Sequence, residues 1–142
     1  MTAESAANLI ARLNLAPHPE GGWYRETWRA PAAPGARSPG TAILFLLEAG
    51  QASHWHRIDA TELWLFQAGT ALTLKTAAHD TGPIAAVRLG PLAGDAPQAV
   101  VAAGEWQAAQ ASPDGWALVA CVVVPGFDFA GFELAAKDWA PG

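Results

Sequence analysis

The sequence predicts an all-β protein, closed into a barrel or folded as two stacked sheets, with one short helix near the N-terminus. Fourteen glycines and eleven prolines among 142 residues recur between apolar runs, a pattern typical of short strands joined by turns. About ten such runs can be counted, and so many short strands need closure or stacking to hide their edges. Because 51% of the residues are hydrophobic, we expect residues 1–142 to form a single domain around a substantial core.

The N-terminal part of the chain is predicted to hold the helix. Apolar residues at helical spacing predict a helix over residues 5–13, with Ser5 or Thr2 as its N-cap. The elements expected next are a tight turn at residues 17–22, a strand at residues 23–28 and a surface loop at residues 30–40.

The remaining chain is predicted to be strands. Residues 41–49 are almost continuously apolar, as in a strand that is buried on both faces. Further strands are predicted at residues 71–76, 84–89, 98–101, 106–109 and 116–124. The phenylalanines of the C-terminal segment are expected to pack against the barrel wall.

The segment Gly50–Gly69 carries the polar residues of most interest. Because strand side chains alternate between faces, His54 and His56 are expected to project to the same side. On the next strand, one face is expected to carry Glu62, Trp64 and Phe66.

The composition excludes some classes of function. The net charge is −5 and the eight Lys and Arg residues are scattered singly, so a surface for nucleic acid is not expected. No signal peptide is visible, and no apolar run reaches the roughly 18 residues that span a bilayer. Cys121 lies in an apolar run and is expected to pack in the core. We therefore expect a cytoplasmic protein that contacts neither nucleic acid nor membrane.

Glu62 is the strongest candidate for chemistry. Burying a carboxylate without a partner is costly, so Glu62 is expected to shift its pKa or to recruit a cation such as Arg57 or a metal. With His56 it forms a candidate catalytic acid–base pair. The alternative is a purely structural ion pair, which produces the same signature.

Aromatic residues suggest a binding pocket. The predicted ligand-binding residues are Trp64, Phe66, Trp106, Gln107, Tyr24 and Arg25. A pocket with aromatic walls suits a planar or sugar-like small molecule. In the alternative interpretation, the rings simply fill the interior of a small barrel.

Three segments carry a resemblance to a known family. PHPEGGWYRET at residues 17–27, WHRIDATELW at residues 55–64 and PGFDFAGFELA at residues 125–135 resemble the uncharacterised cupin family DUF985, or Cupin_5. The resemblance covers nearly the whole chain. It implies the cupin double-stranded β-helix, a jelly-roll barrel that is usually a homodimer, and it supplies no activity.

The cupin resemblance also raises the question of a metal. Cupin motifs hold a transition metal with imidazoles and one carboxylate, and here His54, His56 and Glu62 would supply such a set for Fe, Mn, Ni or Zn. The histidine of the second cupin motif is replaced by Gln107, whose amide oxygen is a weaker ligand. This loss favours a polar hydrogen-bonded cluster without metal, with a three-ligand metal site as the alternative.

Three functions remain open at this point. The first is a small-molecule-binding protein that uses Glu62 and His56 as acid and base. The second is a metal-dependent dioxygenase, isomerase or epimerase, and the third is a storage, sensor or scaffold protein without catalysis.

Overall fold

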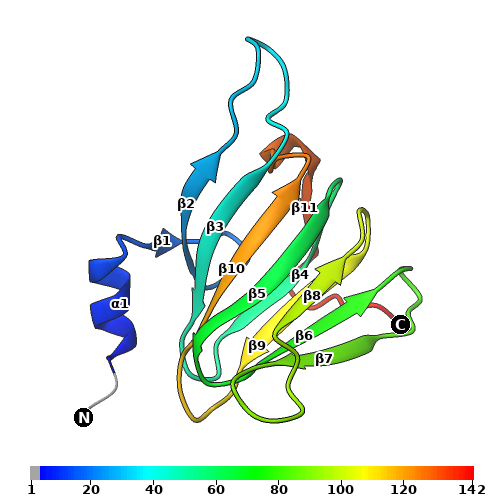
Figure 1. The fold of residues 1–142 in the computed structure, drawn as a ribbon. Coiled ribbons are helices and arrows are strands. Elements are labelled where there is room, and N and C mark those ends of the chain that lie inside the picture. The colour runs from blue at the N-terminus through cyan, green and yellow to red at the C-terminus, as the bar shows by residue number, and fades with distance from the viewer. Residues whose placement is uncertain (1–3) are drawn as a thin grey trace.

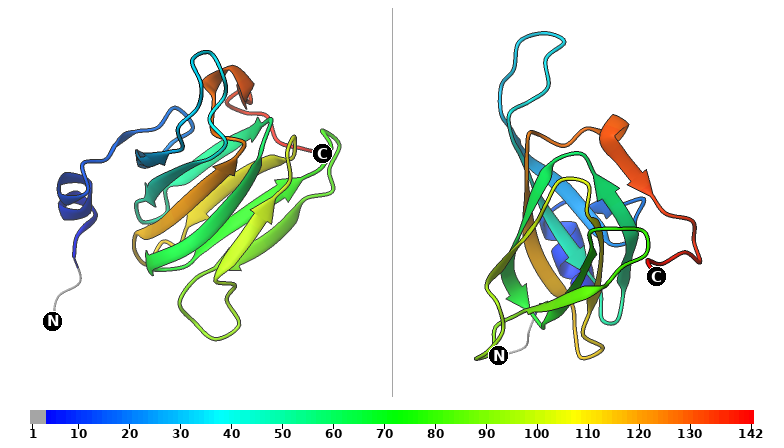
Figure 2. Two further views of the ribbon diagram at one scale, coloured as in Figure 1. Left: turned by 45° about the horizontal axis from the view of Figure 1, so that its top comes forward. Right: turned by 90° about the vertical axis from the view of Figure 1, so that its right-hand side faces the viewer.

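The computed structural model describes residues 4–142 and confirms the all-β prediction with one short N-terminal helix. Two antiparallel sheets face each other and enclose the core (Figures 1 and 2). The first sheet has the order β1 (Ala16–Pro17), β2 (Trp23–Arg29), β3 (Thr41–Leu47), β10 (Ala117–Val124), β5 (Thr61–Gly69) and β8 (Gln98–Val101). The second has the order β11 (Phe132–Leu134), β4 (Ala52–Ile58), β9 (Trp106–Ala111), β6 (Leu72–Ala77) and β7 (Ala85–Leu89).

Helix α1 (Ala6–Arg12) covers part of the outer face of the first sheet. The side chain of Ser5 accepts a hydrogen bond of 3.1 Å from the backbone of Asn8, as expected of an N-cap. The alternative cap, Thr2, lies outside the described residues. Leu9 packs against Leu46 and Leu118 on the sheet, which anchors the helix through its apolar face.

The space between the sheets is divided into an apolar part and an open part. Large side chains, among them Phe45, Trp64, Leu72 and Leu74, fill the apolar part and are at most 2% exposed. At the opposite end, the loop between β2 and β3 extends beyond the sheets on the same side as the 3₁₀ turn η1 (Phe129–Gly131) (Figure 1). The cavity between the two sheets lies at this end, next to η1.

The sequence missed β1 and β11. They are two and three residues long and pair only at a sheet edge. Segments this short show no periodicity from which a strand can be predicted. No helix within residues 4–142 has the length and apolar character needed to cross a membrane.

The prediction that His54 and His56 share one face is wrong. The pairing of β4 with β9 shifts register between Ser53 and His56, which is the signature of a β-bulge. The irregularity brings Ser53 and His56 to the same inner side, where both contact Glu20. His54 instead places Nε2 2.8 Å from the carbonyl oxygen of Ala136, away from the cavity.

Candidate functional site

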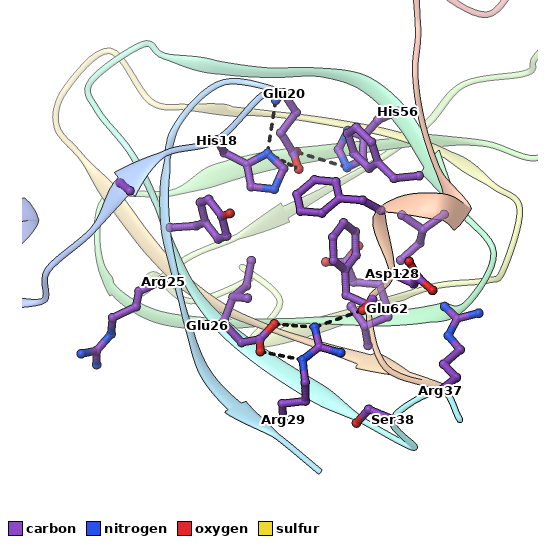
Figure 3. Close-up of a pocket in the computed structure, with 18 of the residues that line it drawn as sticks. His18, Glu20, Arg25, Glu26, Arg29, Arg37, Ser38, His56, Glu62 and Asp128 are labelled. Atoms are coloured by element: carbon purple, nitrogen blue, oxygen red, sulfur yellow. Dashed lines mark hydrogen bonds and ion pairs between the residues drawn. The ribbon is translucent and has the colours of Figure 1, made fainter. Parts of the chain in front are cut away.

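A cavity of about 730 Å³ opens between the two sheets at the end that carries η1 (Figure 3). Its walls are apolar and largely aromatic, formed by Tyr24, Ile43, Ile58, Val123, Phe127, Phe129 and Phe132. Four ionisable side chains at its inner end are His18, Glu20, His56 and Glu62. The cavity therefore combines an apolar wall with a small polar group, as ligand sites do.

A tight turn places Glu20 beneath this cavity. Gly21 has φ +106°, and a Cβ built there would lie 2.5 Å from the carbonyl oxygen of Ala52. Only glycine tolerates both this backbone conformation and this close approach. The backbone N–H of His54 donates to the carbonyl of Glu20 at 2.8 Å, so the turn is fastened to β4.

The carboxyl group of Glu20 lies between two imidazole rings. Its Oε1 lies 3.2 Å from Nδ1 of His18, and its Oε2 lies 3.1 Å from Nε2 of His56. The hydroxyl of Ser53 donates a short hydrogen bond to Oε2. Figure 3 shows Glu20 in contact with both rings at one end of the cavity.

Backbone contacts fix the tautomers of both rings. The N–H of Glu20 donates to Nδ1 of His18 at 3.2 Å, so the neutral His18 ring carries its proton on Nε2. Nδ1 of His56 lies 2.7 Å from the carbonyl oxygen of His54 and must carry the proton there. Both neutral rings therefore present a lone pair to Glu20, and one proton has to lie between the carboxyl and these rings.

Burial decides where that proton is held. Burial raises the pKa of Glu20 to about 8, and the Ser53 hydroxyl opposes part of the rise. Burial, assisted by the nearby His56, lowers the pKa of His18 to about 4. Burial also lowers the pKa of His56. Near neutral pH, Glu20 is accordingly a protonated acid between two neutral imidazoles.

Glu62 is a second ionisable carboxyl at the inner end of the cavity. Its Oε1 accepts a hydrogen bond of 2.8 Å from the amide Nε2 of Gln107. Burial raises the pKa of Glu62 to about 7, the charge on Glu20 adds to this rise, and His56, Gln107 and Cys121 oppose it. Glu62 therefore exchanges its proton close to neutral pH.

Two arginines hold the segment that supplies the phenylalanine wall. Arg29 donates to the carbonyl of Phe127 at 3.1 Å and makes two hydrogen bonds to Glu26. Arg37 donates to the carbonyl of Gly126 at 2.8 Å and makes two hydrogen bonds to Asp59. These guanidinium groups are thus already paired at the cavity mouth.

Some of the predicted site residues meet at the cavity. Glu62, His56 and Tyr24 line it. Gln107 is fully buried behind Glu62 and reaches the site only through that carboxyl. Arg25 borders the opening, but its guanidinium points away from the other labelled side chains (Figure 3).

Other predicted residues lie elsewhere. Trp64 and Phe66 share the inner face with Glu62 as expected, yet they belong to the apolar core rather than to the cavity lining. Trp106 lies on the outer face of its sheet, where it packs against Trp139 and beneath Arg57. Its neighbour Gln107 faces inward, and consecutive strand residues cannot both do so.

From the sequence, the polar segment at residues 18–25 is a candidate to close the mouth of the pocket, but His18, Glu20 and Ser53 are not among the predicted catalytic or ligand-binding residues. The available signal was the polar PHPEGG segment beside a glycine pair, which did not indicate that Glu20 would lie between the rings of His18 and His56. Nothing in the strand periodicity of β4 indicates that Ser53 and His56 face the same way, because the bulge interrupts the alternation.

The predicted metal ligands do not fit a metal. His54 faces away from the cavity, and the amide of Gln107 is engaged by both Trp64 and Glu62. Within residues 4–142, no three His, Cys, Asp or Glu side chains are arranged to hold a metal ion. The inner end of the cavity is better described as a hydrogen-bonded acid–base cluster.

Comparisons with known proteins match this chain over nearly its full length. Residues 7–135 match the family model described as the cupin superfamily family DUF985. A crystal structure of a protein from Shewanella oneidensis is 37% identical with a TM-score of 0.88, and covers 96% of this chain and 87% of its own. A hypothetical protein from Leishmania major is 30% identical with a TM-score of 0.84, and the coverage is 96% of this chain and 90% of that one.

A more distant likeness concerns the fold alone. Oxalate decarboxylase from Bacillus subtilis is 16% identical with a TM-score of 0.64, and the match covers 83% of this chain but 29% of that enzyme. No protein of curated function matches this chain. From the family match and the two close structures, the chain belongs to the DUF985 family of the cupin superfamily.

Proposed function

We propose that the cavity binds a small polar molecule and that Glu62 and the Glu20–His56 pair act on it as acid and base. The observation that carries this proposal is the presence of two ionisable carboxyls, Glu20 and Glu62, at the end of one cavity, both with a pKa near neutrality. Groups that exchange protons near the working pH are the most effective general acids and bases.

The division of roles follows from the protonation states. Glu62, once ionised, accepts a proton from the bound molecule. Glu20, which is protonated and lies 3.1 Å from Nε2 of His56, donates a proton back to the molecule. A proton removed at one carbon and restored at another amounts to an isomerisation, and a proton returned to the opposite face of the same carbon amounts to an epimerisation. Neither step requires a metal.

A thermal-shift screen of a metabolite library tests the binding step. The wild-type chain is expected to be stabilised by at least one compound, because a ligand that binds only the folded state raises its melting temperature. Glu62→Gln keeps the shape and removes the charge, so the same compound should stabilise this variant less.

Glu105→Gln is the matched control. Glu105 lies away from the cavity and accepts a hydrogen bond from the backbone N–H of Ala102, which a glutamine oxygen also accepts. An equal response of wild type, Glu62→Gln and Glu105→Gln to every compound would refute the role given to Glu62.

A further inference from the structure

Two polar atoms at the inner end of the cavity form no hydrogen bond with a nitrogen or oxygen atom of residues 4–142. Gln107 donates to Oε1 of Glu62, but no N–H or O–H group donates to Oε2; the thiol of Cys121, a weak donor, lies nearby. Nε2 of His18 carries a proton and has no acceptor. Glu62 and His18 are 8% and 9% exposed, so a molecule in the cavity is their natural partner.

Glu62 also lacks a counter-charge. No lysine or arginine of the described chain forms an ion pair with it or with Glu20. Arg29 and Arg37 at the mouth are each held by a carboxylate and a backbone carbonyl. The buried end of the cavity is therefore short of positive charge.

We infer that the cavity selects a small organic cation, with an ammonium group against Oε2 of Glu62 and its apolar part against the phenylalanine wall. This inference rests on the proposed function, since it names the class of ligand for the same cavity. An ammonium group supplies the missing counter-charge, and aromatic faces attract cations. An oxygen atom on the same ligand would accept the hydrogen bond that Nε2 of His18 offers.

Anionic and neutral ligands fit less well. An anion at the inner end would face the carboxyls of Glu62 and Glu20 and would require both to stay protonated. Of the arginines that line the cavity, Arg29 and Arg37 are already paired and Arg25 points away from the other labelled side chains (Figure 3). A neutral polyol could satisfy the hydrogen bonds but would leave an ionised Glu62 buried without a counter-charge. A cation gains the most affinity when Glu62 ionises, because it also supplies the counter-charge that a neutral hydrogen-bond donor lacks.

The pH dependence of binding follows from the groups around Glu62. The ionisable groups around it are His56 on β4, Glu20 and His18 on the turn, Cys121 on β10, Tyr24 and Arg25 on β2, and Arg29, Glu26, Arg37 and Asp128 at the mouth. The pKa of Glu62 is about 7, so the carboxylate fraction rises between pH 6 and pH 8. A ligand ammonium, like that of lysine, stays protonated over this range.

Three probes share the same aromatic ring but differ in charge: benzylamine is a cation, benzyl alcohol is neutral and benzoate is an anion. Dissociation constants are measured by ligand-observed NMR titration at pH 6 and pH 8 on wild type, Glu62→Gln and the control Glu105→Gln. At pH 8 benzylamine is expected to bind wild type and the control about tenfold more tightly than benzyl alcohol, with benzoate weakest. This preference should shrink at pH 6, and in Glu62→Gln it should fall to within about twofold at both pH values.

The outcomes separate this inference from the proposed function. If benzyl alcohol or benzoate binds as tightly as benzylamine, the cation inference is overturned while the cavity remains a ligand site. A benzylamine preference that survives in Glu62→Gln overturns the assignment of Glu62. If none of the three probes binds, the cation inference fails, and a metabolite screen without response would remove the proposed function as well.

Discussion

Nε1 of Trp64 donates a hydrogen bond of 2.8 Å to Oε1 of Gln107. An indole N–H can only donate, so this contact fixes the orientation of the Gln107 amide and directs its Nε2 towards Glu62. Trp64 is 1% exposed and Gln107 is fully buried. The chain Trp64–Gln107–Glu62 is thus a buried polar connection from the core to the cavity.

Removing the amide at position 107 should be costly. Gln107→Leu keeps a similar size but leaves the Trp64 indole without a partner and the Glu62 carboxyl with only the weak thiol donor of Cys121. This is expected to lower the free energy of unfolding by roughly 2–5 kcal/mol. Urea unfolding measures this. Gln110→Leu, on the exposed side of the same strand, should change stability by no more than about 0.5 kcal/mol. Similar losses for both variants would contradict the role of Gln107.

Stability should fall as pH rises from about 6.5 to about 8. The pKa values of Glu20 and Glu62 are raised on folding, so the folded state binds more protons than the unfolded state until pH exceeds these values. Below about pH 6.5 the lowered pKa values of His18 and His56 act in the opposite direction and offset this slope. Urea midpoints across this range test the sign.

The matched variant for that measurement is the double substitution Glu20→Gln with Glu62→Gln. It removes both carboxyl groups, so its stability should be nearly independent of pH above about 6.5. A wild-type stability that rises with pH over this window would show that the two carboxyls are not held protonated.

A single methyl group at Gly21 should disrupt the turn that carries Glu20. Gly21→Ala would place Cβ 2.5 Å from a backbone oxygen of Ala52 at a φ of +106°. The expected loss exceeds about 2 kcal/mol, because strain in the backbone adds to the clash. Gly35→Ala is the control, since Gly35 also has a positive φ, +78°, but nothing lies within 4 Å of its added Cβ. Equal losses would show that the contact with Ala52 contributes nothing.

Chelation should leave the protein unchanged. Because His54 faces away from His56, treatment with EDTA and subsequent addition of Zn²⁺ or Mn²⁺ should shift the melting temperature of the wild type by less than about 1 °C. His54→Ala should respond identically. A clear fall in melting temperature after EDTA, restored by one of these ions, would mean that the chain holds a metal in spite of this geometry.

The fold was largely predictable because its signals are local. Glycine and proline between apolar runs mark the turns, and the helix carries its own cap at Ser5. The inward position of Glu62, Trp64 and Phe66 also followed from alternation along β5. The short strands β1 and β11 were not predicted, because they are defined only by their hydrogen bonds to β2 and β4.

The site was predictable only where strand alternation holds. Trp106 and Gln107 are consecutive, so at most one of them could face the interior, and the pattern does not say which. The bulge in β4 turns the side chains of His54 and His56 to different faces, and no residue type in this strand predicts a bulge. Glu20 reaches the cavity through a turn that crosses β4, a contact between segments more than thirty residues apart in sequence. Contacts between segments so far apart produce no periodic pattern in the sequence from which they could be predicted.

The interior consists of an apolar cluster and a cavity, and this arrangement determines which substitutions affect stability and which affect ligand binding. The buried cluster around Phe45, Leu72 and Leu74 contributes no residue to the cavity lining. Tyr24 and Ile43 line the cavity and also pack against this cluster, whereas Phe127 and Phe129 line the cavity without being part of it. Substitutions at Phe127 and Phe129 therefore alter ligand preference without opening the cluster. The ligand preference and the stability of this protein can therefore change separately at the phenylalanine wall, but not at Gln107, which connects Trp64 of the cluster to Glu62 of the cavity.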